Sequence, residues 1–333
     1  MTLFNEYRMP MNLQVLIYGG GAVGLGIASC LVRTAHRVEI IARSQTVAAL
    51  KQDGLIRTGL FGHVHARPGE FVCRESLAEK ERSEFDFVLV CTKSFDSETA
   101  ARDLAEHADR IGSRARLVLF QNGWGNAETF CEYFDRDRIY NARVITGFRR
   151  SRPNEVEVTV HADAIRIGSL FSPDVSAAHP LAQAIREGGI PCEVTEAVAK
   201  DLWAKMLYNC ALNPLGAILR VPYGALADEA STRLLMNQIV REVFGVMSAA
   251  GYRTHWNRPE DFLAVFYERL VPDTAEHRSS MLQDVSAGKC TEIEALNGAV
   301  LKLAERHGIE VPYNRAVYHL IRFIENSAWP AKE

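Results

Sequence analysis

The sequence predicts an α/β domain followed by an all-helical domain. In the first half, short apolar strand patterns alternate with helical patterns, and the first strand runs directly into a glycine turn. From residue 195 onward, long amphipathic helical patterns replace the strands. A chain of 333 residues is long enough for two such domains. We therefore expect a tail over 1–11, an α/β domain over 12–194 and a helical domain over 195–333.

The first strand and its turn predict a dinucleotide-binding site. An apolar run ends in GGGAVG and continues into a small, apolar helical segment. Read as G-x-G-x-x-G, the motif uses Gly19 for the tight turn, Gly21 for close approach to a pyrophosphate and Gly24 for helix packing. The helix start at Ala22 and Val23 would turn its free N–H groups toward the phosphates. This order is typical of a Rossmann-type domain, although glycine-rich plain turns also occur.

The end of the second strand indicates which dinucleotide is bound. Arg43 stands about 20 residues beyond the glycine turn, where an NAD-preferring domain places an acid for the ribose 2′-hydroxyl. A guanidinium binds a 2′-phosphate bidentately, whereas a carboxylate repels it. Glu39 lies in mid-strand and is a poor substitute for that acid. The sequence thus favours NADP (NADPH), with a solvated strand-end charge as the alternative for Arg43.

Two later buried strands, 85–93 and 116–123, end in polar residues. Ligands bind at the carboxyl ends of the strands in open parallel sheets. Lys93 and Asn122 fall at these ends, so we expect them to face the cofactor or the substrate. A merely solvated side chain is the alternative for Lys93.

The remaining strands and helices are predicted from local patterns. Residues 54–72 look like short antiparallel strands inserted on the sheet, and further strands are expected at 139–146, 156–160 and 164–167, before a helix–strand pair at 180–194. In the second half, a helix should open near Asp228 and close at Gly251, and Pro259 and Pro312 suit first turns. Thr291 and Glu294 form a predicted capping box for a helix ended by Gly308.

The segment 202–218 carries the most unusual polar pattern of the second half. Lys205, Asn209 and Asn213 are four residues apart and share one helix face among apolar neighbours. Burying such a stripe without partners would be costly, so it is either a site or an ordinary solvated face. Pro214 removes a backbone hydrogen bond and is expected to kink the helix.

Composition excludes several functional classes. The net charge of −3 includes no basic block, which argues against nucleic-acid or membrane-surface binding. The seven cysteines are scattered without metal-ligand spacing, so we expect free thiols and no metal site. There is neither a signal-peptide pattern nor an apolar run of about 18 residues. A cytoplasmic protein is expected.

Taken in chain order, the motifs resemble those of the ketopantoate reductase family. They are GGGAVG, Arg43, QNG at 121–123, W-x-K-x-x-x-N-x-x-x-N-P at 203–214, SSMLQDV at 279–285 and TEIEALNG at 291–298. The resemblance spans nearly the whole chain after residue 12. It implies NADPH-dependent reduction of a 2-keto acid to a 2-hydroxy acid. Conversion of ketopantoate (2-dehydropantoate) to pantoate, in pantothenate biosynthesis, is the default reaction.

The resemblance also implies residue roles. Lys205 matches the general acid that protonates the carbonyl oxygen, and Glu292 the acid that hydrogen-bonds the substrate and helps to hold that lysine. Ser280 matches the hydroxyl that receives the substrate carboxylate. The other pocket residues implied are Asn209, Asn213 and Asn122. An ammonium suits this chemistry because reduction of a ketone leaves alkoxide character on oxygen. A carboxylate that merely complements a helix dipole is the alternative for Glu292.

Three departures from the family pattern leave the substrate open. Tyr223 and His277 replace positions where asparagine is common, and 147–163 replaces a small, glycine-rich stretch. A branched or aromatic 2-keto acid is therefore an alternative substrate. An NADP-sensing protein without turnover is a further alternative, but a sensor needs no proton donor such as Lys205. The sequence does not determine the oligomeric state, and a homodimer is possible. The substrate is expected to bind in the cleft between the two domains.

Overall fold

The structure is a computed structural model that describes residues 13–34, 37–79 and 82–327, so the expected tail over 1–11 lies outside the described residues. The chain divides into two compact units. The first holds the described residues up to Thr92 with Glu98–Gln121 and Thr129–Glu196. The second holds Lys93–Ser97, Asn122–Glu128 and the described residues from Ala197 onward. Two short segments that follow strands in the sequence thus belong to the second unit.

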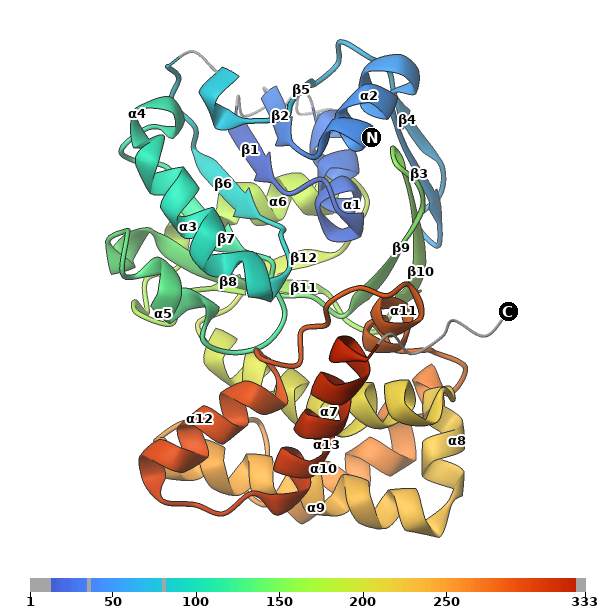
Figure 1. Ribbon diagram of the computed structural model, residues 1–333. Coiled ribbons are helices and arrows are strands. Elements are labelled where there is room, and N and C mark those ends of the chain that lie inside the picture. The colour runs from blue at the N-terminus through green and yellow to red at the C-terminus, as the bar shows by residue number, and fades with distance from the viewer. Residues whose placement is uncertain (1–12, 35–36, 80–81, 328–333) are drawn as a thin grey trace, which may run out of the picture. The chain divides into compact units, whose positions relative to one another are not determined.

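The first unit is built on a mostly parallel sheet, which Figure 1 shows with helices packed on it. Among the described residues the sheet has eight strands, in the order β12 (Cys192–Val194), β11 (Ile165–Gly168), β8 (Ile139–Arg143), β7 (Arg116–Leu119), β6 (Phe87–Val90), β1 (Gln14–Tyr18), β2 (Arg37–Ile41) and β5 (Val72–Arg74). The β8–β11 pair is antiparallel, and the other neighbours are parallel. This sheet confirms the predicted Rossmann-type α/β class.

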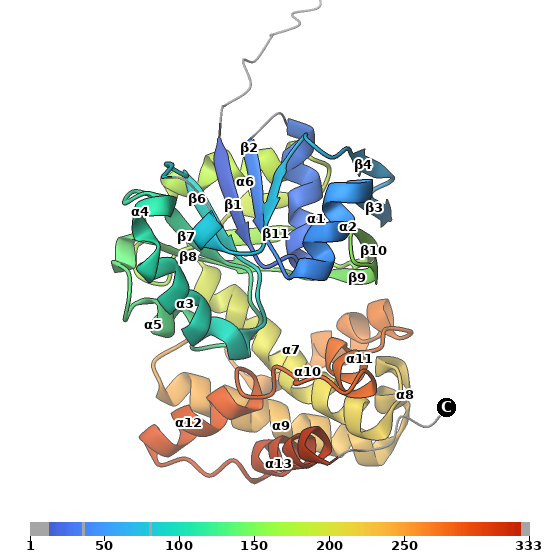
Figure 2. The ribbon, with the colours of Figure 1, turned by 45° about the horizontal axis from the view of Figure 1, so that its top comes forward.

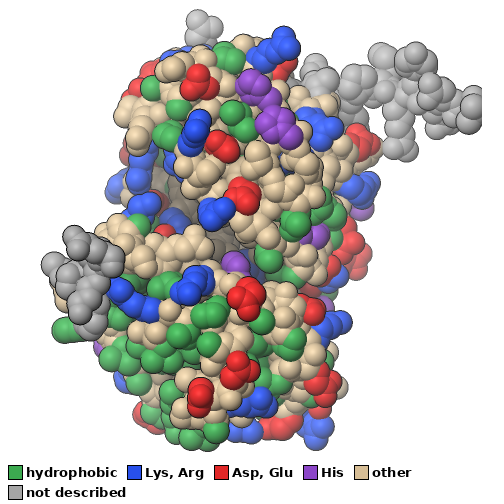
Figure 3. Space-filling model, turned by 90° about the vertical axis from the view of Figure 1, so that its right-hand side faces the viewer, with side chains coloured by type: hydrophobic (Ala, Val, Ile, Leu, Met, Phe, Trp, Pro, Cys, Tyr) green, Lys and Arg blue, Asp and Glu red, His purple; other side chains and the backbone are tan. Residues whose placement is uncertain are grey.

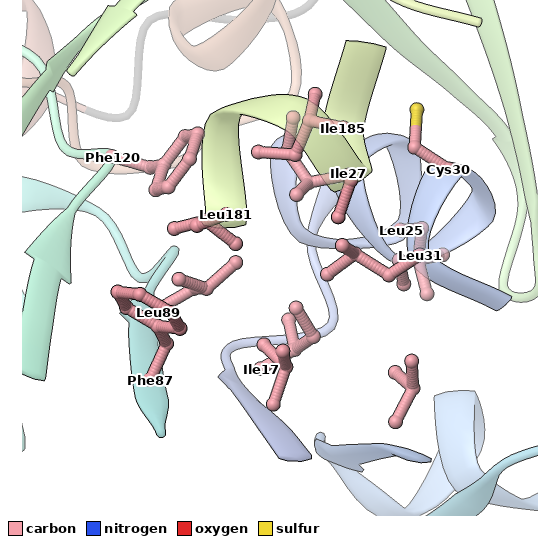
Figure 4. Close-up of a cluster of buried hydrophobic side chains, with 14 of the residues drawn as sticks. Ile17, Leu25, Ile27, Cys30, Leu31, Phe87, Leu89, Phe120, Leu181 and Ile185 are labelled. Carbon is pink, nitrogen blue, oxygen red and sulfur yellow. The ribbon is translucent and has the colours of Figure 1, made fainter. Parts of the chain in front are cut away.

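Side chains of β1 point alternately to the two faces of the main sheet, and different helices cover each face. Val15 and Ile17 join one buried cluster with residues of α1 (Ala22–Leu31) and α6 (His179–Glu187), as Figure 4 shows for Ile17. Tyr18 points to the other face, where its hydroxyl donates to Asp103 of α3 (Ser97–Glu106) at 2.6 Å. Each fully buried Leu, Ile or Phe side chain in such a cluster contributes about 1.5–3 kcal/mol of hydrophobic free energy. The other α-helices of the first half are α2 (Ser44–Asp53) and the shorter α4 (Ala108–Ile111) and α5 (Asn126–Phe130).

A second sheet of the same unit corrects one prediction. Its described strands are β4 (Val64–Ala66), β3 (Leu55–Gly59), β10 (Glu155–His161) and β9 (Thr146–Arg152), in that order. The strands expected within 54–72 do not extend the main sheet as a group, because β3 and β4 pair instead with the distant hairpin β9–β10, and β5 joins the main sheet beside β2. A pairing between residues about 100 positions apart leaves no local pattern to detect. The exposed side of this sheet carries acidic and basic side chains intermingled in the upper half of Figure 3.

The second unit is helical, as predicted. Its described helices are α7 (Val198–Leu219), α8 (Tyr223–Asp228), α9 (Ala230–Ala249), α10 (Pro259–Val265), α11 (Ser280–Ser286), α12 (Asn297–His307) and α13 (Pro312–Asn326). The central helix α7 packs against α9, α11 and α13 and continues through Pro214 (Figure 2). No helix in the described part of the chain combines the length and the apolar character needed to cross a membrane.

The predicted capping box at Thr291 and Glu294 is wrong. Helix α12 begins only at Asn297, and residues 292–296 form a wide turn before it. Thr291 Oγ1 accepts a hydrogen bond from the Ile293 N–H, while Glu294 accepts one from the hydroxyl of Tyr318. Gly308 ends the helix in the left-handed conformation, as expected.

The contact between α6 and α1 gives a stability test. Gly188 ends α6, and a Cβ there would lie 2.3 Å from the carbonyl oxygen of Cys30 in α1 and 2.4 Å from its Cα. Because backbone atoms cannot move aside cheaply, Gly188→Ala should destabilise the protein by about 1–3 kcal/mol. Gly245→Ala in α9 is the control, since nothing lies within 4 Å of its added Cβ, and it should stabilise by about 0.5–1 kcal/mol. Urea denaturation of both variants measures the effect, and a Gly188→Ala protein as stable as the parent would contradict the close packing.

Candidate active site

A buried carboxylate lies at the centre of the candidate site in the second unit. Glu292 is only 6% exposed and belongs to the wide turn before α12. Its Oε1 accepts a hydrogen bond from the backbone N–H of Ser94 at 3.2 Å, and its Oε2 accepts one from Asn122 Nδ2 at 2.8 Å. The ammonium of Lys93 lies 3.6 Å from Oε2 and donates to Asp284 Oδ2 at 2.8 Å. Each carboxylate oxygen of Glu292 therefore has a donor.

Asn122 connects this carboxylate to the lysine of α7. Its Nδ2 donates to Glu292, and its Oδ1 accepts a hydrogen bond from Lys205 Nζ at 2.5 Å. The backbone after Asn122 makes this approach possible, because Gly123 has a φ of +89° and a Cβ there would lie 2.3 Å from the carbonyl oxygen of Ala295. The QNG motif and the turn that contains Glu292 thus fit together through a glycine.

An aromatic cluster fixes the same segment against α7. Trp124 packs on Trp203 and Tyr252 with ring centroids 4.7 Å away in both cases. Trp203 is fully buried, and the backbone N–H of Trp124 donates to the carbonyl of Ala295 at 2.8 Å. Large buried aromatic side chains dominate local packing energy, so this cluster holds Asn122 in place relative to Lys205.

The charges at the site depend on one another. Burial by itself would raise the pKa of the Glu292 carboxyl, but the Lys93 ammonium, the hydrogen bonds from Asn122 and Ser94 and the charge of Lys205 hold that pKa below its usual range. Burial would lower the pKa of Lys93, yet Glu292 and Asp284 together raise it. The pKa of Asp284 is raised by burial despite its ion pair with Lys93. Glu292 is therefore ionised and Lys93 protonated at neutral pH.

The two asparagines of α7 lie on the same face as Lys205. Asn209 is 9% exposed and Asn213 is 6% exposed, so the stripe is largely buried rather than a solvated surface. Asn213 Oδ1 accepts a hydrogen bond from the hydroxyl of Tyr223 at 2.6 Å. That hydroxyl is buried, which raises the pKa of Tyr223 well above its usual value and keeps it a donor.

His277 and two serines lie beside this end of α7. The ring centroid of His277 is 5.2 Å from that of Tyr223, and burial lowers the pKa of His277, so the imidazole is neutral at pH 7. Ser279 caps α11 and donates from Oγ to the carbonyl of Asn213 at 3.3 Å. Ser280, the first residue of α11, is exposed. The structure thus brings Tyr223 and His277 together.

In the first unit, the glycine turn joins β1 closely to the start of α1. A Cβ at Gly24 would lie 2.0 Å from the carbonyl oxygen of Gly19, which requires glycine there. Helix α1 begins at Ala22 with Gly21 as its N-cap and has no side-chain cap, so the N–H groups around Val23 remain available to phosphates. Arg43 is exposed and precedes α2 as its N-cap. These residues fit a dinucleotide, and their cofactor roles remain predictions. Within the described residues there is no cluster of three or more His, Cys, Asp or Glu side chains that could hold a metal ion.

The sequence matches two models of one family. The N-terminal model, described as ketopantoate reductase PanE/ApbA, matches residues 15–171, and the model of its C-terminal region matches residues 197–325. A 2-dehydropantoate 2-reductase of Aquifex aeolicus (strain VF5) is 34% identical over 316 residues, which cover 94% of this chain and 97% of the relative. The chain belongs to the ketopantoate reductase family. A 2-dehydropantoate 2-reductase of Archaeoglobus fulgidus is 29% identical over 94% of this chain and 98% of its own.

Solved structures of the ketopantoate reductase family agree with this assignment. The crystal structure of a PanE/ApbA family ketopantoate reductase from Ralstonia eutropha JMP134 superposes with a TM-score of 0.82 at 30% identity, and the match covers 94% of this chain and 99% of that one. A D-mandelate dehydrogenase with NADH and anilino(oxo)acetate reaches a TM-score of 0.83 at 22% identity, over 94% and 99% of the two chains, which shows a shared fold alone.

The structure brings four of the residues predicted for the site together and shows one further residue, Asp284, that the sequence analysis missed. Lys93, Asn122, Lys205 and Glu292 form one connected network. That Lys93 faces the cofactor or the substrate stays a prediction. Asp284 lies in the SSMLQD motif but was given no role, because its partner Lys93 is 191 residues away in sequence. The stretch 147–163, expected near the substrate pocket, forms most of the hairpin β9–β10 of the first unit.

The ion pair between Lys93 and Asp284 can be tested by titration. Burial lowers the pKa of Lys93, and the carboxylates of Glu292 and Asp284 raise it. Asp284→Asn removes one of these two carboxylates, so the pKa of Lys93 should fall toward its ordinary value. The ¹³Cε chemical shift of Lys93, followed against pH by NMR, reports this change. Asp273→Asn, a change at an exposed acid of the same unit, is the control and should leave the titration unmoved. An unchanged Lys93 pKa in Asp284→Asn would show that the pair does not form in solution.

Proposed function

We propose that this protein reduces ketopantoate (2-dehydropantoate) to pantoate with NADPH. The observation that carries the proposal is the network in which Lys205 Nζ donates to Asn122, which in turn donates to the ionised Glu292. The largely buried amides of Asn209 and Asn213 extend from Lys205 along α7. The curated relatives named above, 34% and 29% identical to this chain, carry the name 2-dehydropantoate 2-reductase. Its place is the cytoplasm, which suits the free thiols of the seven cysteines.

The reaction requires one hydride and one proton. NADPH, when bound, supplies the hydride to the keto carbon and leaves as NADP⁺. Lys205 donates the proton from Nζ to the carbonyl oxygen, which becomes the hydroxyl of pantoate, and the neutral amine then regains a proton from solvent. An ammonium at this oxygen also stabilises the negative charge that develops in the transition state.

The other residues of the network orient the proton donor and the substrate. Asn122 Oδ1 accepts one N–H of Lys205, which orients the ammonium at the end of that side chain. The negative charge of Glu292 favours the protonated lysine. Ser280, Asn209 and Asn213 supply neutral donors for the substrate carboxylate and hydroxyl. The glycine turn and Arg43 hold the pyrophosphate and the 2′-phosphate of the cofactor.

Oxidation of NADPH, followed at its absorption band, tests the proposal directly. Ketopantoate should support turnover in a panel of branched and aromatic 2-keto acids, and NADPH should be preferred to NADH. Lys205→Ala should lower kcat by about 100-fold or more, the usual scale for loss of a general acid. Lys200→Ala, at an exposed lysine of the same helix, is the matched control and should keep full turnover. Tight NADPH binding without oxidation by any 2-keto acid would favour the NADP-sensing alternative instead.

The hydrogen bond from Tyr223 to Asn213 predicts a specific effect on substrate binding. The bond fixes the side-chain amide of Asn213 with its oxygen toward Tyr223, so that its N–H groups are presented to the substrate. Tyr223→Phe should therefore raise KM for ketopantoate by about 3- to 10-fold, the scale of one neutral hydrogen bond, with kcat nearly unchanged. Tyr208→Phe is the control, because its hydroxyl bonds to Thr274 instead. If both variants raised KM equally, Tyr223 would contribute packing rather than orientation.

A further inference from the structure

The side chain of Arg150 lies against the first turn of α2. Arg150 belongs to β9, and its Nη2 donates to Thr46 Oγ1 and to the carbonyl of Pro153 at 2.7 Å. Its Nε donates to the carbonyl of Arg152 at 3.2 Å. Thr46 is buried and lies two residues beyond the start of α2. Arg150 is thus held at the end of α2 that begins with Arg43.

The strand register explains why Arg150, and not Arg149, reaches this place. Arg150 is paired with Val156 and Phe148 with Val158, and both valines belong to the buried cluster of the first unit. Phe148 packs on α1, where a Cβ at Gly26 would lie 2.4 Å from its ring. Side chains alternate along a strand, so Arg150 shares this inner face. Arg149 points to the other face and forms an ion pair with Glu157.

Among the described residues, no carboxylate forms an ion pair with the cations at this end of α2. Neither Arg43 nor Arg150 is among the ion-paired residues of the described chain, and three acids of β2 and β10 are paired with other arginines. These acids are Glu39 with Arg74, Glu155 with Arg152 and Glu157 with Arg149. The pKa of Arg150 is lowered by partial burial of its guanidinium and by the positive charge of Arg43. Two cations close enough to repel each other favour an anion between them.

The same place adjoins the glycine turn. A Cβ at Gly20 would lie 2.5 Å from the Cβ of Ala42 and 3.2 Å from Cγ2 of Thr46. One side of Thr46 therefore contacts the turn that would hold the pyrophosphate, and its hydroxyl contacts Arg150. In Figure 2, α2 and β9 lie on the same side of the first unit as α1. A dinucleotide on this turn would bring the ribose 2′ position to the end of β2.

We propose that Arg150 is a second guanidinium ligand for the 2′-phosphate of NADPH, together with Arg43. The inference rests on the proposed use of NADPH and names a residue from a different sheet that completes the site. A phosphomonoester carries nearly two negative charges at pH 7, with a second pKa of about 6, so two guanidiniums neutralise it where one does not. NADH presents a neutral 2′-hydroxyl at this position and gains nothing from the second cation.

Binding of two nucleotides to the full-length protein tests this assignment without turnover. Adenosine 2′,5′-bisphosphate carries the 2′-phosphate and 5′-AMP lacks it, and isothermal titration calorimetry measures both. Arg150→Ala should lower the affinity for the bisphosphate by roughly 10- to 100-fold, which is the scale of hydrogen bonds to a charged group. The affinity for 5′-AMP should change by no more than about twofold. Arg149→Ala is the matched control, one residue away on the opposite face, and should change neither affinity. Arg150→Lys keeps the charge and should retain part of the discrimination.

Three other results of this binding experiment would contradict the assignment of Arg150 or the use of NADPH. If Arg150→Ala weakened both nucleotides equally, Arg150 would support α2 structurally and would not be a phosphate ligand. If Arg43→Ala abolished the preference for the bisphosphate while Arg150→Ala and Arg150→Lys preserved it, this inference would fail and the use of NADPH would stand. If the unmodified protein bound both nucleotides equally, the preference for NADPH would fail, and the inference with it.

Discussion

The second unit is organised around the buried carboxylate of Glu292. An ionised side chain that is only 6% exposed is tolerated only if charges and hydrogen bonds replace the water it has lost. The compensating groups come from the Lys93 ammonium, the Ser94 N–H and the Asn122 amide. All three follow the ends of β6 and β7 in the chain, yet they fold with the helical unit. The need to compensate one carboxylate explains why these two short segments leave the sheet domain to which their strands belong.

The same requirement explains the choice of an amide at Asn122. Its nitrogen donates to Glu292, which leaves the oxygen to accept from Lys205, so one side chain connects the carboxylate to the ammonium of Lys205. An aspartate could accept from the lysine, but it would place a second negative charge beside Glu292. A leucine of similar size would leave both neighbours unsatisfied. The polar residue expected at a strand end is therefore specified by two partners that lie 83 and 170 residues away in the chain.

Local signals in the sequence predicted most of the fold and only part of the site. The glycine turn, the apolar strands and the stripe from Lys205 to Asn213 follow from short-range periodicity, and the α/β and helical classes are confirmed. The capping box at Thr291 failed because the turn before α12 is shaped by tertiary contacts, among them the hydroxyl of Tyr318 on Glu294. The sheet that joins β3 to β10 and the pairing of Lys93 with Asp284 depend on long-range contacts, which carry no periodic signal.

The departures from the family pattern separate into two groups once the units are known. The stretch 147–163 lies in the first unit and brings Arg150 to the start of α2, so under our proposals it acts on the cofactor. Tyr223 and His277 lie in the second unit, where the backbone N–H of Tyr223 donates to the carbonyl of His277 at 3.1 Å and their rings pack together. The two residues are therefore in contact, so a substitution at one changes the surroundings of the other. Neither Tyr223 nor His277 is charged at neutral pH, so these two departures add no charge beside Asn213. Under the proposed function, these two departures would act on recognition of the substrate side chain and not on that of the carboxylate that all 2-keto acids share.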